Sequence, residues 1–380
     1  MSTDRLPVGA LAALSCAAFI AVVTELLPAG LLAPMGADLG VAPGRAGFLV
    51  SGYALASFAA ALPVTAALRS APRRPVLLVV LAAFAILNAA SALSSSYAVT
   101  FAVRVLAGVA GGTLWAMLIG YAAQLAPAAR RGRAIAIVSA GITLALCAGV
   151  PAGSTLARVI GWRAAFAVLA VLAGLLAVWV WRAVAPVAGQ AAGRRLPLAS
   201  VLRLPGVAAS LALTLGVLLA HQGVYTYLAP LARRAGVDEA GGVLLVFGLA
   251  TVAGVWLTGA LIDGRGRSGV RLALGAVAAA MSVLGVAGQG AAALVAAVAL
   301  WGLAFGGLPT LLQAALIERT GAHHADVATA LQTTVYNAGI AGGSFAGGLL
   351  LDGAGAWVLP WAALGVLGPA LAAVLLRARA

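Results

Sequence analysis

The sequence predicts an all-α integral membrane protein with twelve transmembrane helices arranged as two six-helix bundles. Three observations lead to this fold class. Hydrophobic residues make up 63% of the 380 positions and charged residues only 8%, whereas a soluble domain is about half apolar and about a quarter charged. Apolar stretches of transmembrane length recur along the chain, and short arginine clusters separate them. A soluble core cannot hide this much apolar surface, so we expect the lipid bilayer to surround it.

The individual spans follow from the rule that about 20 mostly apolar residues cross a bilayer. Loops at arginine, proline and glycine clusters delimit six stretches in each half of the chain. The first six are expected at 8–33, 46–68, 75–94, 98–123, 134–157 and 163–182. The second six are expected at 206–230, 241–262, 270–289, 291–317, 326–351 and 357–377. The first stretch is too long for the core of a signal peptide, so we expect it to remain as a helix.

The longest polar connection divides the chain into two halves. We expect an N-terminal bundle at 1–182, a cytoplasmic linker at 183–205 and a C-terminal bundle at 206–380. Residues 49–54 and 245–250 have similar sequences at an offset of 196 positions, which indicates an internal duplication.

The arginines predict the orientation of the chain. With a cytoplasmic N-terminus, 17 arginines fall on cytoplasmic segments and five on outer loops, while Arg104 lies within a span. Because basic residues are enriched on the cytoplasmic side, we expect both termini in the cytoplasm and the chain in a bacterial inner membrane. These topology signals also explain the net charge of +14, so we expect no nucleic-acid partner.

Glu25 and Arg104 are the acidic and the basic residue that lie deepest within spans. An ionisable group in hydrocarbon costs a few kcal/mol and usually faces a cavity or a partner. Counting the helical rise places both residues at similar depth in the outer half of the bilayer, which is compatible with a Glu25–Arg104 pair. The functional interpretation of Glu25 is a carboxyl group that couples transport to protons or contacts substrate. The alternative is a structural residue held by hydrogen bonds near Pro28.

Further polar residues in the spans are candidate substrate contacts, because polar groups there tend to face a bundle interior or a cavity. The candidates are Tyr53, His221, Gln222, Tyr225, Gln313, Tyr336 and Asn337. Hydrogen bonding between helices is the alternative interpretation of such residues.

Glycines spaced four apart predict close helix crossings. The spacing occurs at Gly108 and Gly112, at Gly149 and Gly153, and in a run of three at Gly339, Gly343 and Gly347. We expect Pro151, which lies within the second pair, to bend its helix.

Several functions are disfavoured by the sequence. The two cysteines lie in apolar runs without histidine or acidic neighbours, so we expect neither a disulfide nor a metal site. The sequence has no glycine-rich phosphate-binding loop of the kind that ATP hydrolysis requires. We therefore expect no enzyme activity and no cofactor.

Four stretches carry recognisable motifs. They are residues 24–32 in the first span, Arg104–Gly112 in the fourth, Gly149–Gly153 with 161–163 at the fifth, and 259–267 after the eighth, which includes Asp263, Arg265 and Arg267. In order and content they resemble the major facilitator superfamily, in particular its twelve-span bacterial drug:proton antiporters, which include sugar-efflux and chloramphenicol-resistance permeases. The loop at 69–74 departs from the pattern, because it has the basic cluster but lacks the family's aspartate.

The resemblance implies two bundles built from inverted repeats, a central site and alternating access, with helices one, four, seven and ten lining the cavity. It implies a role for Arg104 in proton transfer, an association of the fifth-helix motif with export, and a gating role for the loop that holds Asp263. We therefore expect a monomeric transporter that exports a small organic compound, such as a drug, sugar or metabolite, in exchange for protons. An uncoupled facilitator or importer, and a non-transporting sensor or scaffold, are the alternatives.

Overall fold

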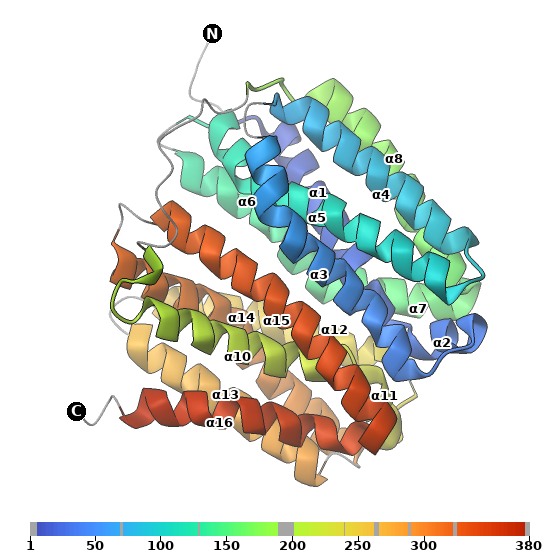
Figure 1. Cartoon of the computed structure of the whole chain (residues 1–380), viewed down its shortest axis with the longest axis vertical. Coiled ribbons are helices and arrows are strands. Elements are labelled where there is room, and N and C mark those ends of the chain that lie inside the picture. The colour runs from blue at the N-terminus through green and yellow to red at the C-terminus, as the bar shows by residue number, and fades with distance from the viewer. Residues whose placement is uncertain are drawn as a thin grey trace. The chain divides into compact units, whose positions relative to one another are not determined.

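The computed structural model describes residues 6–68, 71–127, 130–188, 201–238, 240–261, 266–287, 290–321 and 325–376. All regular elements in these ranges are helices (Figure 1). Within them, nine helical stretches are long and apolar enough to cross a membrane, and they coincide with nine of the twelve expected spans. The other three expected spans coincide with α3 (Pro43–Ala67), α15 (Ala325–Ala354) and α16 (Leu359–Leu376). The all-α membrane fold is confirmed.

The first half of the chain contains two irregular turns, each beside a proline. Its helices are α1 (Val8–Leu26), α2 (Leu32–Leu39), α3, α4 (Arg73–Leu93), α5 (Tyr97–Leu125), α6 (Arg131–Leu144), α7 (Val150–Ile160) and α8 (Trp162–Ala183). A 3₁₀ turn, η1 (Leu27–Gly30), follows α1 and contains Pro28, and a π-helical turn, η3 (Ala145–Gly149), precedes Pro151. Proline has no N–H, so the carbonyl four residues earlier loses its helical donor and the hydrogen-bond pattern changes. The expected uniform spans 8–33 and 134–157 are therefore interrupted.

The first span of the second half is also interrupted near a proline. Its helices are α10 (Val207–Tyr225), α11 (Leu228–Arg234), α12 (Ala240–Leu261), α13 (Gly266–Ala287), α14 (Ala291–Thr320), α15, the 3₁₀ turn η5 (Ala356–Val358) and α16. The expected span 206–230 is two helices, α10 and α11, which meet at Thr226. Pro230 lies four residues after Thr226 and removes the N–H that an unbroken helix would offer to its carbonyl.

The chain forms two compact units. Unit 1 comprises Met1–Val41 and Gly52–Arg194, and unit 2 comprises Ala42–Ser51 and Arg195–Ala380. The division near residue 194 falls within the expected linker at 183–205, of which residues 189–200 lie outside the described residues. The start of α3 belongs to unit 2, where the amide N–H of Gly44 donates to the carboxylate of Asp352 at 2.9 Å.

In unit 1, the expected glycine pair of the fourth span brings α5 against α3. A Cβ atom at Gly108 would overlap the backbone carbonyl of Tyr53, and one at Gly112 would overlap that of Ser57. Only glycine therefore permits this approach of the two helices.

In unit 2, two glycines bring α14 against α12 in the same way. A Cβ atom at Gly302 would overlap the carbonyl of Phe247, and one at Gly306 would overlap that of Thr251. These four residues each lie 194 positions after their counterparts in unit 1, close to the offset of 196 at which the sequence repeats. The helix contact is thus duplicated, which strengthens the interpretation of an internal repeat.

The other expected glycine stripes also lie at helix contacts. Gly149 in η3 faces Phe19 and Val23 of α1, and Gly153 faces Leu27. The run Gly339, Gly343 and Gly347 of α15 packs on α10 at Leu218, Leu219 and Gly223. The prediction of close crossings at these positions is confirmed.

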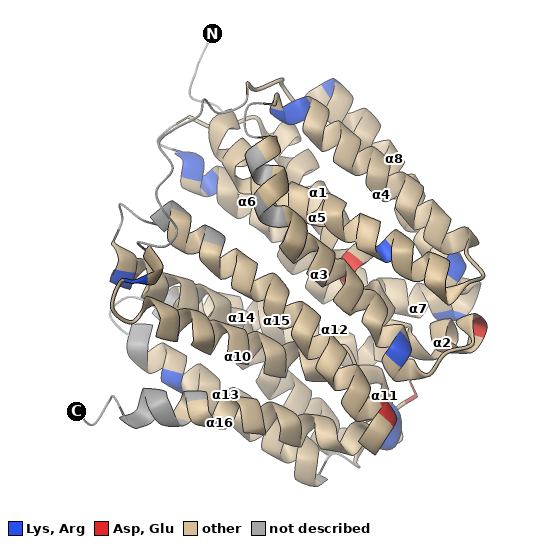
Figure 2. Ribbon diagram, in the orientation of Figure 1, with Lys and Arg blue, Asp and Glu red and all other residues tan. Residues whose placement is uncertain are grey.

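Charged residues lie mostly near helix ends (Figure 2). Among the described side chains, Glu25 and Arg104 are the buried carboxylate and the buried guanidinium, at 6% and 1% exposure. Both belong to unit 1.

Candidate functional site

Arg104 of α5 binds the backbone of the first span at the point where α1 gives way to η1. Its guanidinium donates hydrogen bonds to the carbonyl oxygens of Thr24 at 2.5 Å and of Glu25 at 2.9 Å. Pro28 explains the first of these bonds, because it removes the N–H that would otherwise bind the Thr24 carbonyl. The proline that interrupts the span therefore creates an acceptor for a buried cation.

The carboxyl group of Glu25 is buried beside this contact. Its Oε1 atom has no hydrogen-bond partner among the described residues, although the charge of Arg104 acts on the carboxyl group. Arg104 therefore contacts Glu25 through a hydrogen bond to its backbone carbonyl, and a pair between the two side chains stays a prediction. A buried carboxyl oxygen without a partner carries a large desolvation cost, which binding of a proton or a polar ligand would offset.

Tyr53 completes the charged cluster, which consists of Glu25, Tyr53 and Arg104. The guanidinium carbon of Arg104 lies 4.7 Å from the centroid of the Tyr53 ring, a cation–π geometry that supports a desolvated cation. The hydroxyl of Tyr53 is buried and has no hydrogen-bond partner among the described residues. The Tyr53 hydroxyl fits against α5 because residue 111 is a glycine, and a Cβ atom at Gly111 would overlap the hydroxyl oxygen.

Asn88 of α4 supports the same turn of α1, and the sequence reasoning missed it. Its amide donates to the hydroxyl of Thr24 at 3.1 Å and to the carbonyl of Phe84 at 2.8 Å. Asn88 is one of two asparagines in the sequence, and that rarity within an apolar span was the available signal.

A second cluster, in unit 2, consists of five rings. His221 and Tyr225 come from α10, Phe247 from α12, and Trp301 and Phe305 from α14. The His221 and Phe305 rings are stacked, with centroids 3.6 Å apart and an interplanar angle of 6°. Tyr225 lies 5.4 Å from His221 at 22°, and Trp301 meets His221 edge-on at 5.1 Å. Phe247 contacts Trp301 at 4.9 Å. We call this set the aromatic cluster.

The aromatic cluster contains two residues that the sequence predicted, His221 and Tyr225, and three that it did not. The missed residues are Phe247, Trp301 and Phe305. Residues four apart lie on one helix face, and both His221/Tyr225 and Trp301/Phe305 have this spacing. That spacing was the available signal on α14.

Other predicted substrate contacts form hydrogen bonds within unit 2. Gln222 donates to the Thr226 hydroxyl at 3.0 Å, Gln313 of α14 donates to the Thr329 hydroxyl of α15 at 3.3 Å, and Asn337 donates to the Thr333 carbonyl at 3.1 Å. The hydroxyl of Tyr336 is buried and has no partner among the described residues. Substrate binding by these residues stays a prediction.

The predicted gating loop after α12 lies largely outside the described residues. Asp263 and Arg265 are not described, and Arg267 is described only as part of the α13 backbone. The gating role of this loop stays a prediction.

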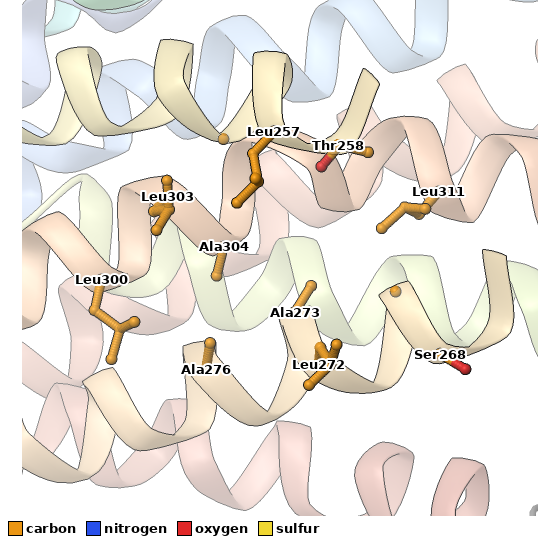
Figure 3. A pocket seen from close by; sticks show the side chains of 12 residues that line it. Leu257, Thr258, Ser268, Leu272, Ala273, Ala276, Leu300, Leu303, Ala304 and Leu311 are labelled. Atoms are coloured by element: carbon orange, nitrogen blue, oxygen red, sulfur yellow. The ribbon is translucent and has the colours of Figure 1, made fainter. Parts of the chain in front are cut away.

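Unit 2 also contains an apolar hollow between α12, α13 and α14, with a volume of about 240 Å³ (Figure 3). Leucine and alanine side chains from all three helices line it, and Thr258 and Ser268 are the polar side chains among its twelve lining residues. None of these twelve described residues has a buried polar atom that lacks a partner. The hollow therefore offers little to orient a polar substrate.

Comparison with known proteins places the chain in a family. The sequence profile of the Major Facilitator Superfamily matches residues 14–344. The purine ribonucleoside efflux pumps NepI of Salmonella enteritidis and Salmonella typhimurium are each 31% identical to this chain over 345 residues, which cover 88% of this chain and 85% of each pump.

Solved structures share the fold at lower sequence identity. A mutant of the nucleoside transporter NupG superposes with a TM-score of 0.75 at 14% identity, covering 97% of this chain and 99% of that one. The human organic anion transporter TETRAN superposes with a TM-score of 0.68 at 18% identity, with the same coverage.

Taken with these relatives, the apolar helical fold and its buried charged residues define a multi-pass membrane transporter rather than an enzyme. The chain belongs to the Major Facilitator Superfamily. The predicted resemblance to this superfamily is confirmed, and the alternative of a non-transporting sensor or scaffold loses its support.

Proposed function

We propose that this chain exports purine nucleosides, or closely related small compounds, in exchange for protons by alternating access. The observation that carries the proton coupling is the buried Glu25 carboxyl group, whose Oε1 atom has no partner among the described residues. The substrate class comes from the NepI pumps, which are named for purine ribonucleosides.

Proton binding at Glu25 changes the charge of the cluster around Arg104. With Glu25 ionised, its negative charge attracts the guanidinium, and with Glu25 protonated, that attraction is lost. Because the guanidinium binds the carbonyl oxygens of Thr24 and Glu25, a change in this attraction acts on the α1–η1 junction. Protonation is thereby coupled to the conformation of the first span.

The proposed arrangement in the cell follows the sequence. The proposed bundles at 1–182 and 206–380 are joined by a cytoplasmic linker at 183–205. The protein lies in the bacterial inner membrane with both termini on the cytoplasmic side. The ratio of 17 to five arginines between the two sides supports this orientation. A single chain forms the transporter, and no cofactor takes part.

One observation favours an uncoupled facilitator as the second candidate. The Arg104 guanidinium donates hydrogen bonds to backbone carbonyls near Pro28. A purely structural role, in which Arg104 stabilises the break in the first span, produces the same bonds. In that case Glu25 balances the charge of Arg104 and moves no proton.

Proteoliposomes separate the two candidates. We expect an inosine gradient to drive measurable proton movement with the wild type and no proton movement with Glu25→Gln, whose thermal unfolding in detergent stays close to that of the wild type. Glu318→Gln, which removes an exposed acid at the end of α14, is the matched control and retains proton movement. Proton movement in Glu25→Gln at the wild-type rate contradicts the coupling role.

A further inference from the structure

We propose that the aromatic cluster of unit 2 is the subsite for the planar ring of the substrate, and that a purine base extends the His221–Phe305 stack from the Phe305 side. The inference rests on the proposed function and adds the residues that recognise the base. It concerns unit 2 alone.

The geometry of the His221–Phe305 stack suits a planar ligand. His221 and Phe305 are nearly parallel and close, at 3.6 Å between centroids and 6° between planes. Planar rings of nucleobases bind aromatic side chains by stacking in this manner. The glycine contact of Gly302 with Phe247 holds α14 and α12 together, so the rings that support the stack are fixed by packed helices.

The five rings of the aromatic cluster differ in exposure. His221, Tyr225, Phe247 and Trp301 are buried, whereas Phe305 is half-buried. Phe305 is therefore the ring through which the cluster reaches the surface of unit 2. We therefore place the planar ligand against Phe305, the ring of the cluster that is not buried.

Three of the buried rings in the aromatic cluster carry polar edges. Nδ1 of His221, the hydroxyl of Tyr225 and Nε1 of Trp301 have no hydrogen-bond partners among the described residues. The indole N–H only donates, whereas the phenol donates and accepts, as neutral imidazole also does through its two nitrogens. A buried polar group without a partner is destabilising, because it has lost its hydrogen bonds to water. These polar edges are covered, so a base stacked on Phe305 does not reach them, but they distinguish the aromatic cluster from a purely hydrocarbon core.

Two other regions fit a base less well. The Tyr53 ring is covered by the Arg104 guanidinium at 4.7 Å. The apolar hollow of Figure 3 has neither an aromatic wall nor an unpaired buried polar atom.

Transport kinetics of Phe305 variants test the inference. We expect Phe305→Leu to raise the KM for inosine about tenfold, because stacking is lost, while the maximal rate changes less than about twofold. Phe305→Tyr keeps the ring and stays close to the wild type. Trp256→Leu removes an aromatic ring that is 78% exposed on α12, and it serves as the matched control with an unchanged KM.

The readouts separate this inference from the proposed function. Inosine transport with an unchanged KM in both Phe305→Leu and His221→Leu overturns the aromatic subsite and leaves the export function standing. If the wild type does not transport inosine, binding is read from inosine quenching of tryptophan fluorescence. Quenching that Trp301→Phe removes supports the subsite, and absence of quenching overturns it. Ribose alone, which lacks the base, is expected to neither quench nor compete.

Discussion

Unit 1 and unit 2 use the same kind of glycine contact to bring two helices together, yet they place different chemistry beside it. Where Gly108 brings α5 against Tyr53 of α3, the neighbouring side chain is a cation, since Arg104 lies one turn before Gly108. Where Gly302 brings α14 against Phe247 of α12, the neighbouring side chain is Trp301 and the surroundings are aromatic. The duplicated packing therefore fixes where side chains meet and leaves their chemistry free to differ.

The breaks in the first and seventh spans show the same contrast. At the first, Arg104 binds the carbonyl that Pro28 leaves without a helical donor. At the seventh, beside Pro230, neutral groups form a chain in which Gln222 donates to the Thr226 hydroxyl and that hydroxyl bonds to Ser344 at 2.8 Å. A charged break responds to protonation, whereas a neutral break does not. This difference is the basis of our proposal that unit 1 couples protons and unit 2 recognises the ring.

Removal of the buried cation should have the largest effect. Arg104→Ala leaves Glu25 without its partner and two carbonyls without a donor, so we expect a loss of about 3 kcal/mol in stability and no transport. Thermal unfolding in detergent and inosine uptake into proteoliposomes measure both. Arg104→Lys keeps the charge but not the forked geometry, and we expect it to recover stability more than transport.

Arg182→Ala provides the control for this substitution, because Arg182 is exposed at the end of α8. Its unfolding temperature should match that of the wild type. An Arg104→Ala protein that is as stable as Arg182→Ala would show that the charged cluster does not hold α1.

Alanine at the two equivalent glycines tests whether the packing is shared. A methyl group at Gly108 or Gly302 overlaps a backbone carbonyl, and we expect each substitution to cost about 2 kcal/mol through strain. Thermal unfolding in detergent compares them with Gly120→Ala and Gly275→Ala, where a Cβ meets nothing within 4 Å. A large loss of stability from the substitution in one unit and none from the substitution in the other would show that the two glycine contacts are not equivalent.

Loss of Asn88 should have a smaller effect confined to unit 1. Asn88→Ala removes a hydrogen bond to the Thr24 hydroxyl, and we expect about 1 kcal/mol of destabilisation. A double-mutant cycle with Thr24→Val measures the coupling between the two side chains. Additive effects of the two substitutions would show that this hydrogen bond does not stabilise the turn.

The smallest effect is expected at Asp38, outside the spans. Its carboxylate accepts hydrogen bonds from the Trp162 indole at 2.9 Å and from the Arg163 guanidinium, and these bonds hold the pKa of Asp38 below its ordinary value. A lowered pKa stabilises the fold above about pH 4, the unfolded pKa of aspartate, and that contribution is lost as the pH falls through the folded pKa.

Because the Asp38 side chain is about half-exposed, Asp38→Asn should shift the unfolding temperature at pH 7 less than Asn88→Ala does. Near pH 3 the difference from the wild type should shrink. A difference that grows towards low pH would contradict the sign of the pKa change.

How far the sequence predicts this molecule depends on what a linear pattern contains. The spans and the matching depths of Glu25 and Arg104 follow from hydropathy and helical rise, which are properties of one helix at a time. The stack of His221 on Phe305 depends on how α10 and α14 rotate about their axes, which no single span reveals. Predicting the hydrogen bonds of Arg104 to backbone carbonyls would have required knowing that the helix changes to a 3₁₀ turn at Pro28. The sequence pattern also could not distinguish Gln222 and Gln313, which form hydrogen bonds within unit 2, from His221, which stacks on an aromatic ring.

The most direct test of the division between the two units is inosine exchange at equal pH in Glu25→Gln proteoliposomes. If unit 1 couples protons and unit 2 holds the ring, the variant should exchange labelled inosine at about the wild-type rate and gain no acceleration from a pH gradient. Exchange that is lost together with the pH response, or a pH response that survives the substitution, would contradict the separation of the two roles.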